Sequence, residues 1–322
     1  MHMLPLSVVI CTFNRAGYLE LALKSLLTQT LGRERYEIVI IDDGSTDSTK
    51  DVVDIFRYQL PIRYFYQYNS GLAAAKNLGI EKACGDIIFF FDDDDIATPA
   101  LLEEHLKTHN KYPESSYAVL NYTTWSPELR VTSLMKFITE VGCYLFSYPN
   151  VKKGKAIDYT YFWGGRSSCK RSMLVSHGTF NPLFRFGCED IELGYRLSKH
   201  GFKVIYNPKA ISYMARSVNL SDFLQRLVKQ GSSQYLFSSM YIDPEVDKWC
   251  EINGFQEEWL QIEPVYKAAV TSALSLEKIA DTKLELGLEV DALTERLFYQ
   301  SLWSIFRGAK IKGMVNCHSR ME

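Results

Sequence analysis

The first two thirds of the chain alternate between short apolar runs and segments whose apolar residues recur with helical spacing. The apolar runs, rich in β-branched and aromatic residues, are at residues 6–11, 37–41, 62–66 and 86–91. The helical segments are at residues 18–30, 46–56, 71–83 and 101–111, the second with Ser45 or Thr46 as its N-cap. Such alternation is typical of a parallel sheet. We therefore expect an α/β fold with a mostly parallel central sheet flanked by helices.

The pattern changes near residue 218. Before it we expect a strand at 117–122, a segment without clear period at 123–155, a helix at 189–200 and a strand at 203–206. After it only helical patterns remain, most clearly at 260–279 and 284–305, which have amphipathic spacing. We therefore expect an α/β domain over residues 1–218, with a first half of about 1–122 and a second of about 123–218, and a helical C-terminal extension over 219–322.

Composition excludes several classes of protein. The 322 residues include 47% hydrophobic and 23% charged residues and carry a net charge of -2, as in an ordinary globular protein. This near-neutral balance argues against a nucleic-acid binder. The seven cysteines are odd in number and scattered, which predicts neither a disulfide framework nor a zinc site. With no signal-peptide pattern and no apolar run long enough to span a bilayer, we expect a cytoplasmic protein.

Four consecutive aspartates follow the apolar run at residues 87–91. A run this apolar predicts a strand buried on both faces, so the carboxylates would lie at its carboxyl end, where open α/β sheets bind ligands. Asp92 and Asp94 would point to the same side of an extended chain and together could bind one hard divalent cation. The alternative is a solvated acidic turn that caps the next helix.

Two other strand ends carry polar residues on the same predicted edge. Thr12 follows the first strand and Asp43 follows the second. An aspartate there can accept hydrogen bonds from a base imide or a ribose hydroxyl. The alternative for Asp43 is a turn with a helix cap.

Two helix starts complete the set of candidate residues. Small residues open the helix at 71–83, where Lys76 could pair with a phosphate, unless the segment is a packing face. Glu189 and Asp190 begin another helix, whose dipole favours their ionised forms and so keeps a carboxylate available as a base. The alternative is an acidic first turn with Arg196 as its salt-bridge partner.

In this order along the chain, the motifs resemble those of the family 2 glycosyltransferases, which have the GT-A fold. The resemblance covers residues 6 to about 216. It implies that the first half of the α/β domain binds the donor and the second half the acceptor. The residue roles that it implies are metal ligands (Asp92, Asp94), donor contacts (Thr12, Asp43, Lys76, Asp93) and the catalytic base with its neighbour (Asp190, Glu189).

The resemblance also implies a chemistry. A Mn²⁺ or Mg²⁺ ion would stabilise the departing diphosphate of a nucleotide-diphosphate sugar, most simply a UDP-sugar, since uracil's imide N–H suits the Asp43 carboxylate. A hydroxyl of a glycan or lipid-linked acceptor would attack from the opposite side, with inversion. A non-catalytic glycan- or nucleotide-binding module with the same fold is the alternative.

The chain departs from the family's pattern at one place. Many members carry a histidine just after the segment 208–214, which helps to hold the metal or the diphosphate, and this chain has none there. Either Arg216 binds the diphosphate directly, or metal binding is weaker and depends on the donor.

Two aromatic segments leave alternatives open. Trp163 and Gly164 are candidates for the acceptor site, because an aromatic face stacks on a sugar ring, although Trp163 could equally be a core residue beside a turn. Residues 303–320 mix basic and apolar side chains without an acid. They could contact the inner face of a membrane peripherally, form a helix packed on the catalytic domain, or be a frayed end, and we favour packing. The sequence does not predict an oligomeric state.

Overall fold

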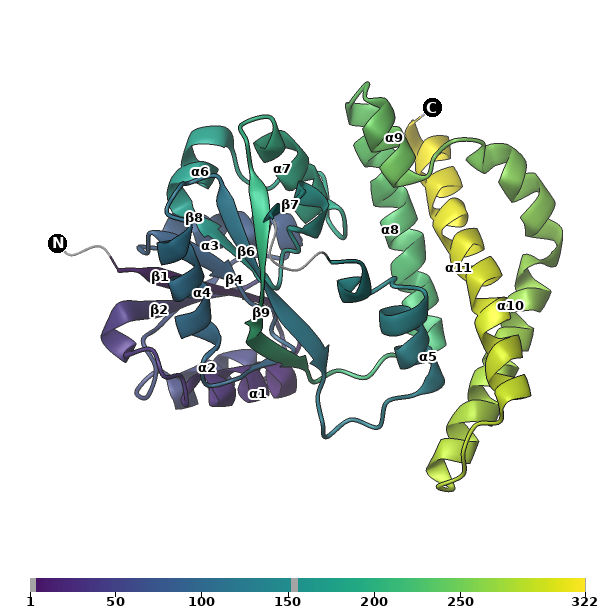
Figure 1. Ribbon diagram of the computed structural model, residues 1–322, viewed down its shortest axis with the longest axis horizontal. Coiled ribbons are helices and arrows are strands. Elements are labelled where there is room, and N and C mark those ends of the chain that lie inside the picture. The colour runs from purple at the N-terminus through teal and green to yellow at the C-terminus, as the bar shows by residue number, and fades with distance from the viewer. Residues whose placement is uncertain (1–3, 152–155, 322) are drawn as a thin grey trace. The chain divides into compact units, whose positions relative to one another are not determined.

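The computed structural model describes residues 4–151 and 156–321, so the last residues of the segment without clear period, 152–155, lie outside it. Four parallel strands form one side of its central sheet, in the order β3-β2-β1-β4. They are β1 (Leu6–Thr12), β2 (Tyr36–Asp42), β3 (Ile62–Tyr66) and β4 (Ile87–Phe90). Every residue of β2 and β4 is buried, as expected for strands covered on both faces. The predicted parallel sheet with its flanking helices is confirmed (Figure 1).

Beyond β4 the sheet becomes mixed. Its further strands are β8 (Ser167–Lys170), β6 (Tyr117–Trp125), β9 (Lys203–Met214) and β5 (Asp95–Ala97), and the short β7 (Ala156–Ile157) pairs with β9. β8 is antiparallel to both β4 and β6, whereas β6 and β9 are parallel. β9 is far longer than the predicted strand at 203–206, because a register shift next to Asn121 lets it pass Pro208 and continue along β5.

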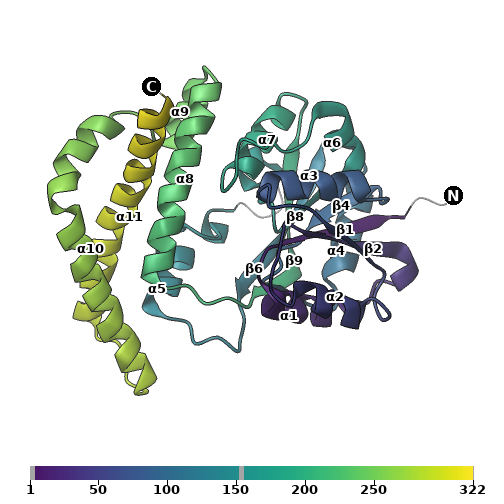
Figure 2. The same ribbon diagram turned by 180° about the vertical axis from the view of Figure 1, so that it is seen from behind.

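Helices cover the sheet on both faces. They are α1 (Ala16–Leu26), α2 (Thr49–Phe56), α3 (Leu72–Lys82), α4 (Leu101–Lys111), α6 (Arg171–His177) and α7 (Glu189–Ser198). The 3₁₀ turns are η1 (Arg33–Arg35), η3 (Tyr148–Asn150) and η4 (Tyr159–Tyr161). Side chains of α1, α2 and α4 share one hydrophobic core with alternate residues of β1 and β2. Figure 2 shows α3 on the opposite side of these strands from α1 and α2.

One helix start differs from its prediction. α2 begins at Thr49, so Ser45 and Thr46 do not cap it. Asp47 instead accepts a hydrogen bond from the Thr49 amide, while the Ser45 hydroxyl accepts one from the Asn14 amide. Residues 45 and 46 therefore join two strand-end loops rather than starting the helix.

The chain divides into two compact units. The first contains residues 1–129, 150–185 and 189–216, and the second residues 130–149, 186–188 and 217–322. The second is helical, with α5 (Ser133–Lys136), the π-helix η2 (Phe137–Val141), α8 (Leu220–Met240), α9 (Pro244–Cys250), α10 (Phe255–Glu285) and α11 (Ala292–Met321). The predicted helical extension is present. The boundary predicted between the helices at 260–279 and 284–305 is wrong, because α10 runs to Glu285. The turn between α10 and α11 contains Gly287, which has a φ of 71°. The domain limits expected from the sequence stay a prediction.

α8 and α11 pack closely within the second unit. Ile305, Phe306 and Ile311 are fully buried, so this segment is packed within the helical unit and is not a frayed end, whereas packing on the catalytic domain stays a prediction. A Cβ atom on Gly313 would overlap the carbonyl oxygen of Val228, so the two helix backbones approach too closely for any larger residue. None of the helices in residues 4–151 and 156–321 has both the length and the apolar character to cross a membrane. The peripheral membrane contact stays a prediction.

We predict that Gly313→Ala destabilises the protein, because the added methyl group forces α8 and α11 apart. Overpacking of this kind costs about 1–3 kcal/mol of unfolding free energy. Urea unfolding followed by circular dichroism measures it. Gly17→Ala in α1 is the matched control, since no atom beyond the nearby backbone of its own helix lies within 4 Å of its added Cβ and it should be neutral or stabilising. Equal unfolding midpoints for the two variants would contradict this packing.

Candidate functional site

The four aspartates are not a solvated turn. Asp93, Asp94 and Asp95 are only 4%, 4% and 0% exposed. The Asp92 amide donates to the Gly165 carbonyl at 3.2 Å, and Asp95 begins β5, which pairs with β9. The acidic run is thus built into the sheet at the end of β4, and the alternative of a solvated cap is wrong.

Arginines from three separate parts of the chain reach these carboxylates. Arg15, after β1, lies 2.9 Å from Asp93 and 3.4 Å from Asp94. Arg216, after β9, donates from Nε to Asp94 Oδ2 at 2.7 Å. Three guanidinium groups for four carboxylates leave one excess negative charge when all are ionised.

Arg166 bridges the two ends of the run. Its guanidinium donates to Asp92 at 2.7 Å and to Asp95 at 2.9 Å, and it is itself only 8% exposed. The other oxygen of Asp95 accepts from the Ser212 hydroxyl at 2.8 Å. The sequence indicated no role for Asp95. Its hydrogen bonds orient Arg166 and β9, and Asp95 therefore supports the cluster.

Burial makes ionisation of these carboxyls costly. It raises the pKa of Asp93 to about 6 and of Asp95 to about 7, opposed by Arg15 and Arg166 respectively and reinforced by the neighbouring carboxylates. The Thr12 hydroxyl favours the ionised form of Asp93 and so lowers its pKa, which indicates that Thr12 lies beside the cluster; its contact with the donor stays a prediction. An added cation would therefore be strongly favoured here.

The donor set fits a hard divalent cation. Carboxylate oxygens of Asp92, Asp94 and Asp95 lie within 4.8 Å of one another. Mg²⁺ and Mn²⁺ prefer such oxygen ligands. Because Asp95 is fully buried and both its oxygens accept hydrogen bonds, Asp92 and Asp94 are the two better placed to bind an ion.

Asp43 lies at the same edge of the sheet but serves its own loop. Its carboxylate accepts hydrogen bonds from the Gln67 side chain at 2.6 Å and from the Ser70 and Gly71 amides, both at 2.9 Å. Gly71 has a φ of 92°, a conformation that glycine adopts without strain, and it leads directly into α3. Asp43 therefore positions the start of the helix that carries Lys76, whatever else it binds.

Lys76, Glu189 and Asp190 meet although 113 residues separate the first two. Lys76 Nζ lies 2.9 Å from Glu189 Oε1, with both side chains only 5% exposed. Asp190 accepts from the Gly164 amide at 2.8 Å. A Cβ on Gly164 would overlap Lys76 Nζ, so glycine lets this backbone lie against the three charges without displacing the lysine side chain. Lys76 is therefore no surface lysine.

The electrostatics single out Asp190. Burial, followed by repulsion from Glu189, raises the pKa of Asp190 to about 6, against the effect of Lys76. The second oxygen of Glu189 is buried without a hydrogen-bond partner among the described residues. Arg196 pairs with Glu192 at 2.7 Å, so the proposed first-turn partner of Glu189 and Asp190 is engaged elsewhere. The pair is thus left facing Lys76.

One small cavity is lined by Asp92 of the aspartate run and by Lys76 and Gly164, which contact Glu189 and Asp190. A void of about 10 Å³, the size of one water molecule, is lined among others by Cys11, Lys76, Asp92 and Gly164. Burial raises the pKa of the Cys11 thiol to about 12, so it stays protonated. Residues predicted for the metal, the donor and the acceptor therefore surround the same space.

Trp163 stands beside this region on the segment that follows η4. Its indole N–H donates to the Thr160 carbonyl at 3.0 Å, and its ring lies 5.9 Å from that of Tyr161. The ring is partly buried, which leaves its acceptor role a prediction. Arg15, Arg166 and Asp95 were not predicted; for the two arginines the signal was that a buried acidic run requires compensating cations.

Comparisons with known proteins identify the family of this chain. The sequence model of the family described as "Glycosyl transferase family 2" matches residues 7–173. A validoxylamine A glucosyltransferase of Streptomyces hygroscopicus subsp. jinggangensis is 33% identical over 223 residues, covering 62% of this chain and 53% of the relative. An uncharacterized glycosyltransferase of Haemophilus influenzae is 29% identical over 199 residues, covering 55% of this chain and 78% of the relative. The chain thus spans about half the length of the validoxylamine relative that it matches.

Solved structures share the fold. The mannosyltransferase PcManGT from Pyrobaculum calidifontis, in complex with GDP-Man and Mn²⁺, has a TM-score of 0.65 at 18% identity, over 98% of this chain and 88% of that one. Residues 1–349 of S. aureus TarS, in complex with UDP, have a TM-score of 0.57 at 14% identity, over 99% of this chain and 92% of that one. At these identities the likeness concerns the fold.

Proposed function

The chain belongs to glycosyl transferase family 2, and on this premise we propose that it moves a sugar from a nucleotide-diphosphate donor to an acceptor hydroxyl. The donor is most simply a UDP-sugar, and the acceptor is a glycan or a lipid-linked saccharide. The observation that carries the proposal is the convergence of Lys76, Asp92 and Gly164 on one cavity, with Asp190 hydrogen-bonded to Gly164. The candidate metal ligand Asp92, the buried ammonium group of Lys76 and the candidate base Asp190 are thereby brought together.

The donor side of the site is built on strand ends. Asp43 would accept from the nucleotide base, Asp93 would face the ribose, and Thr12 would line the same pocket. Asp92 and Asp94 would hold a Mn²⁺ or Mg²⁺ ion, which when bound neutralises the charge of the departing diphosphate. PcManGT is described with Mn²⁺ and GDP-Man, and TarS with UDP, which supports a nucleotide-sugar donor for this chain.

Arg216 is the residue that we expect to take the role of the histidine that many family members carry after the segment 208–214. Its guanidinium is 2.7 Å from Asp94, where it already supplies positive charge beside the proposed ion ligand. Arginine matches the oxygens of a phosphate group with two parallel donors. We propose that Arg216 binds the diphosphate directly, which is the first of the two alternatives that the sequence leaves open.

Asp190 acts as the general base. It removes the proton of the acceptor hydroxyl while the oxygen forms its bond to the anomeric carbon and the bond from that carbon to the diphosphate breaks. One displacement from the opposite face inverts the configuration. A pKa of about 6 suits a base near neutral pH, because the carboxylate is ionised yet still accepts a proton. Glu189 orients Lys76 beside it, and Trp163 and Gly164 line the acceptor side.

We predict that Asp190→Asn retains donor binding and loses transfer by about 10²–10⁴-fold, the usual contribution of a general base. Release of nucleoside diphosphate from a panel of nucleotide sugars, with and without oligosaccharide acceptors, measures turnover, and calorimetry measures donor binding. Asp54→Asn is the control, since Asp54 lies on the exposed face of α2 and pairs with Lys50. Full turnover in Asp190→Asn would refute the base assignment. Donor binding without any turnover in the unaltered protein would favour the non-catalytic module instead.

We predict a pH profile with an acid limb. As pH falls through about 6, Asp190 gains a proton and kcat/KM declines tenfold per pH unit, whereas above this pH the limb is flat. Glu189→Gln removes the neighbouring negative charge and should move the limb to lower pH. A limb whose position is the same in both proteins would show that another group controls the rate.

A further inference from the structure

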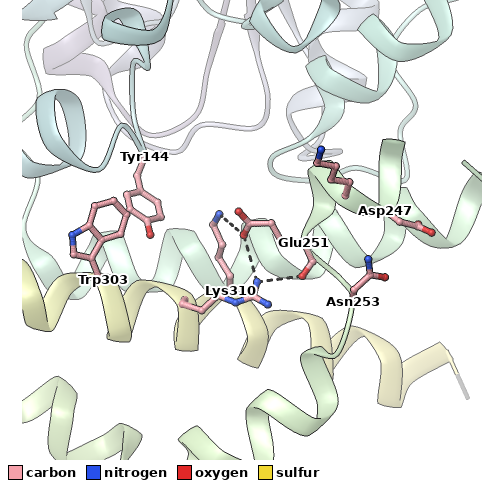
Figure 3. Close-up of a pocket in the computed structure, with 8 residues that line it drawn as sticks. Tyr144, Asp247, Glu251, Asn253, Trp303 and Lys310 are labelled. Atoms are coloured by element: carbon pink, nitrogen blue, oxygen red, sulfur yellow. Dashed lines mark hydrogen bonds and ion pairs between the residues drawn. The ribbon is translucent and has the colours of Figure 1, made fainter. Parts of the chain in front are cut away.

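The helical unit contains a larger cavity that the proposed reaction does not use. It has a volume of about 480 Å³, within the usual range for small-molecule sites, and lies between α9, α11 and the segment that carries Tyr144. Figure 3 shows Tyr144 and Trp303 together at one end, Glu251 and Lys310 near the middle, and Asn253 with Asp247 at the other end.

The aromatic end is both exposed and rigid. Trp303 is 47% exposed, although its ring packs at 5.2 Å against Phe137 and at 5.8 Å against Tyr144. Tyr144 in turn packs edge-on against buried Phe306 at 4.9 Å. A large ring that is held from behind and open in front loses little side-chain entropy on binding. It offers the flat apolar surface on which the C–H face of a pyranose ring stacks.

The middle of the cavity presents a fixed array of donors and acceptors. Glu251 Oε2 lies 3.2 Å from Lys310 Nζ and 3.4 Å from Arg307, whose guanidinium also donates to the Glu251 carbonyl at 3.2 Å. Glu251 has a φ of 58° at the C-terminus of α9, a position that favours glycine. An acidic side chain kept in this strained conformation suggests a role for the carboxylate itself.

Charge balance indicates an uncharged ligand. Lys248, Arg307 and Lys310 are matched by Asp247 and Glu251 in the lining and by Glu258, which accepts from Arg307 at 2.6 Å. An anion would have to displace these acids from their partners, whereas a sugar hydroxyl can donate to a carboxylate and accept from a cation at once. Burial and Glu251 raise the pKa of Tyr144 to about 12, so its phenol remains a donor.

We propose that this cavity binds an uncharged pyranose glycan, with one ring stacked on Trp303 and its hydroxyls bonded to Glu251, Arg307 and Lys310. The helical unit would then be a second glycan-binding site, separate in its residues from the site that contains Asp190. Its use in acceptor recognition rests on the proposed transferase function. The binding itself does not.

Titration calorimetry of the full chain tests the proposal without any nucleotide sugar. The probes are maltotetraose, cellotetraose, chitotetraose and mannotetraose, with trigalacturonate as the anionic comparison. We expect at least one neutral probe to bind more tightly than trigalacturonate. Trp303→Ala should weaken that binding about tenfold or more, Trp303→Phe should weaken it less, and Glu251→Gln should also weaken it. Leu297→Ala, which removes another exposed side chain of α11 (44% exposed), should leave it unchanged.

Three results would overturn the inference: no neutral probe binds at millimolar concentration, trigalacturonate binds best, or Trp303→Ala binds as the unaltered protein does. The outcome is distinct from that of the transferase assays. Glycan binding by a protein that never turns over a nucleotide sugar would refute the proposed function alone. Turnover with no glycan binding would refute this inference alone.

Discussion

The ion pairs between the aspartate run and its arginines are the interaction on which the site depends. Adjacent carboxylates at the end of a buried strand repel one another, and they are retained because Arg15, Arg166 and Arg216 reach them from three distant segments. Since Arg166 holds both Asp92 and Asp95, the loop before β8 and the strand β5 are tied to the end of β4. When all four carboxyls are ionised one negative charge remains, which a bound cation would neutralise.

Elements defined by local patterns were predicted well. The strand at 62–66 and the helix at 101–111 have the bounds of β3 and α4, because apolar spacing within one segment decides them. Elements that depend on distant partners were not. The length of β9 follows from its pairing with β6 and β5, and residues 130–149 join the helical unit through contacts that no local period indicates.

The same division holds within the site. The order of strand ends and helix starts predicted the candidate residues, and the structure brings Lys76 to Glu189 and Asp190. The sequence could not predict that Asp95 lies buried next to the cluster, or which of the many arginines neutralise the charge of the carboxylates. Ion pairs between distant segments leave no periodic pattern in the sequence. Asp43 was expected either to contact the donor or to shape a turn; three of its hydrogen bonds shape the loop that leads into α3, and its donor contact stays a prediction.

We propose that the aspartate cluster is a cation site that serves nucleotide-sugar chemistry. The most direct measurement is the rate of nucleoside diphosphate release from UDP- and GDP-sugars before chelation, in excess EDTA, and after addition of Mn²⁺ or Mg²⁺. We predict that release stops on chelation and returns with the added ion, and that Asp94→Asn, folded as judged by circular dichroism, does not recover. Unchanged release in excess EDTA would contradict it.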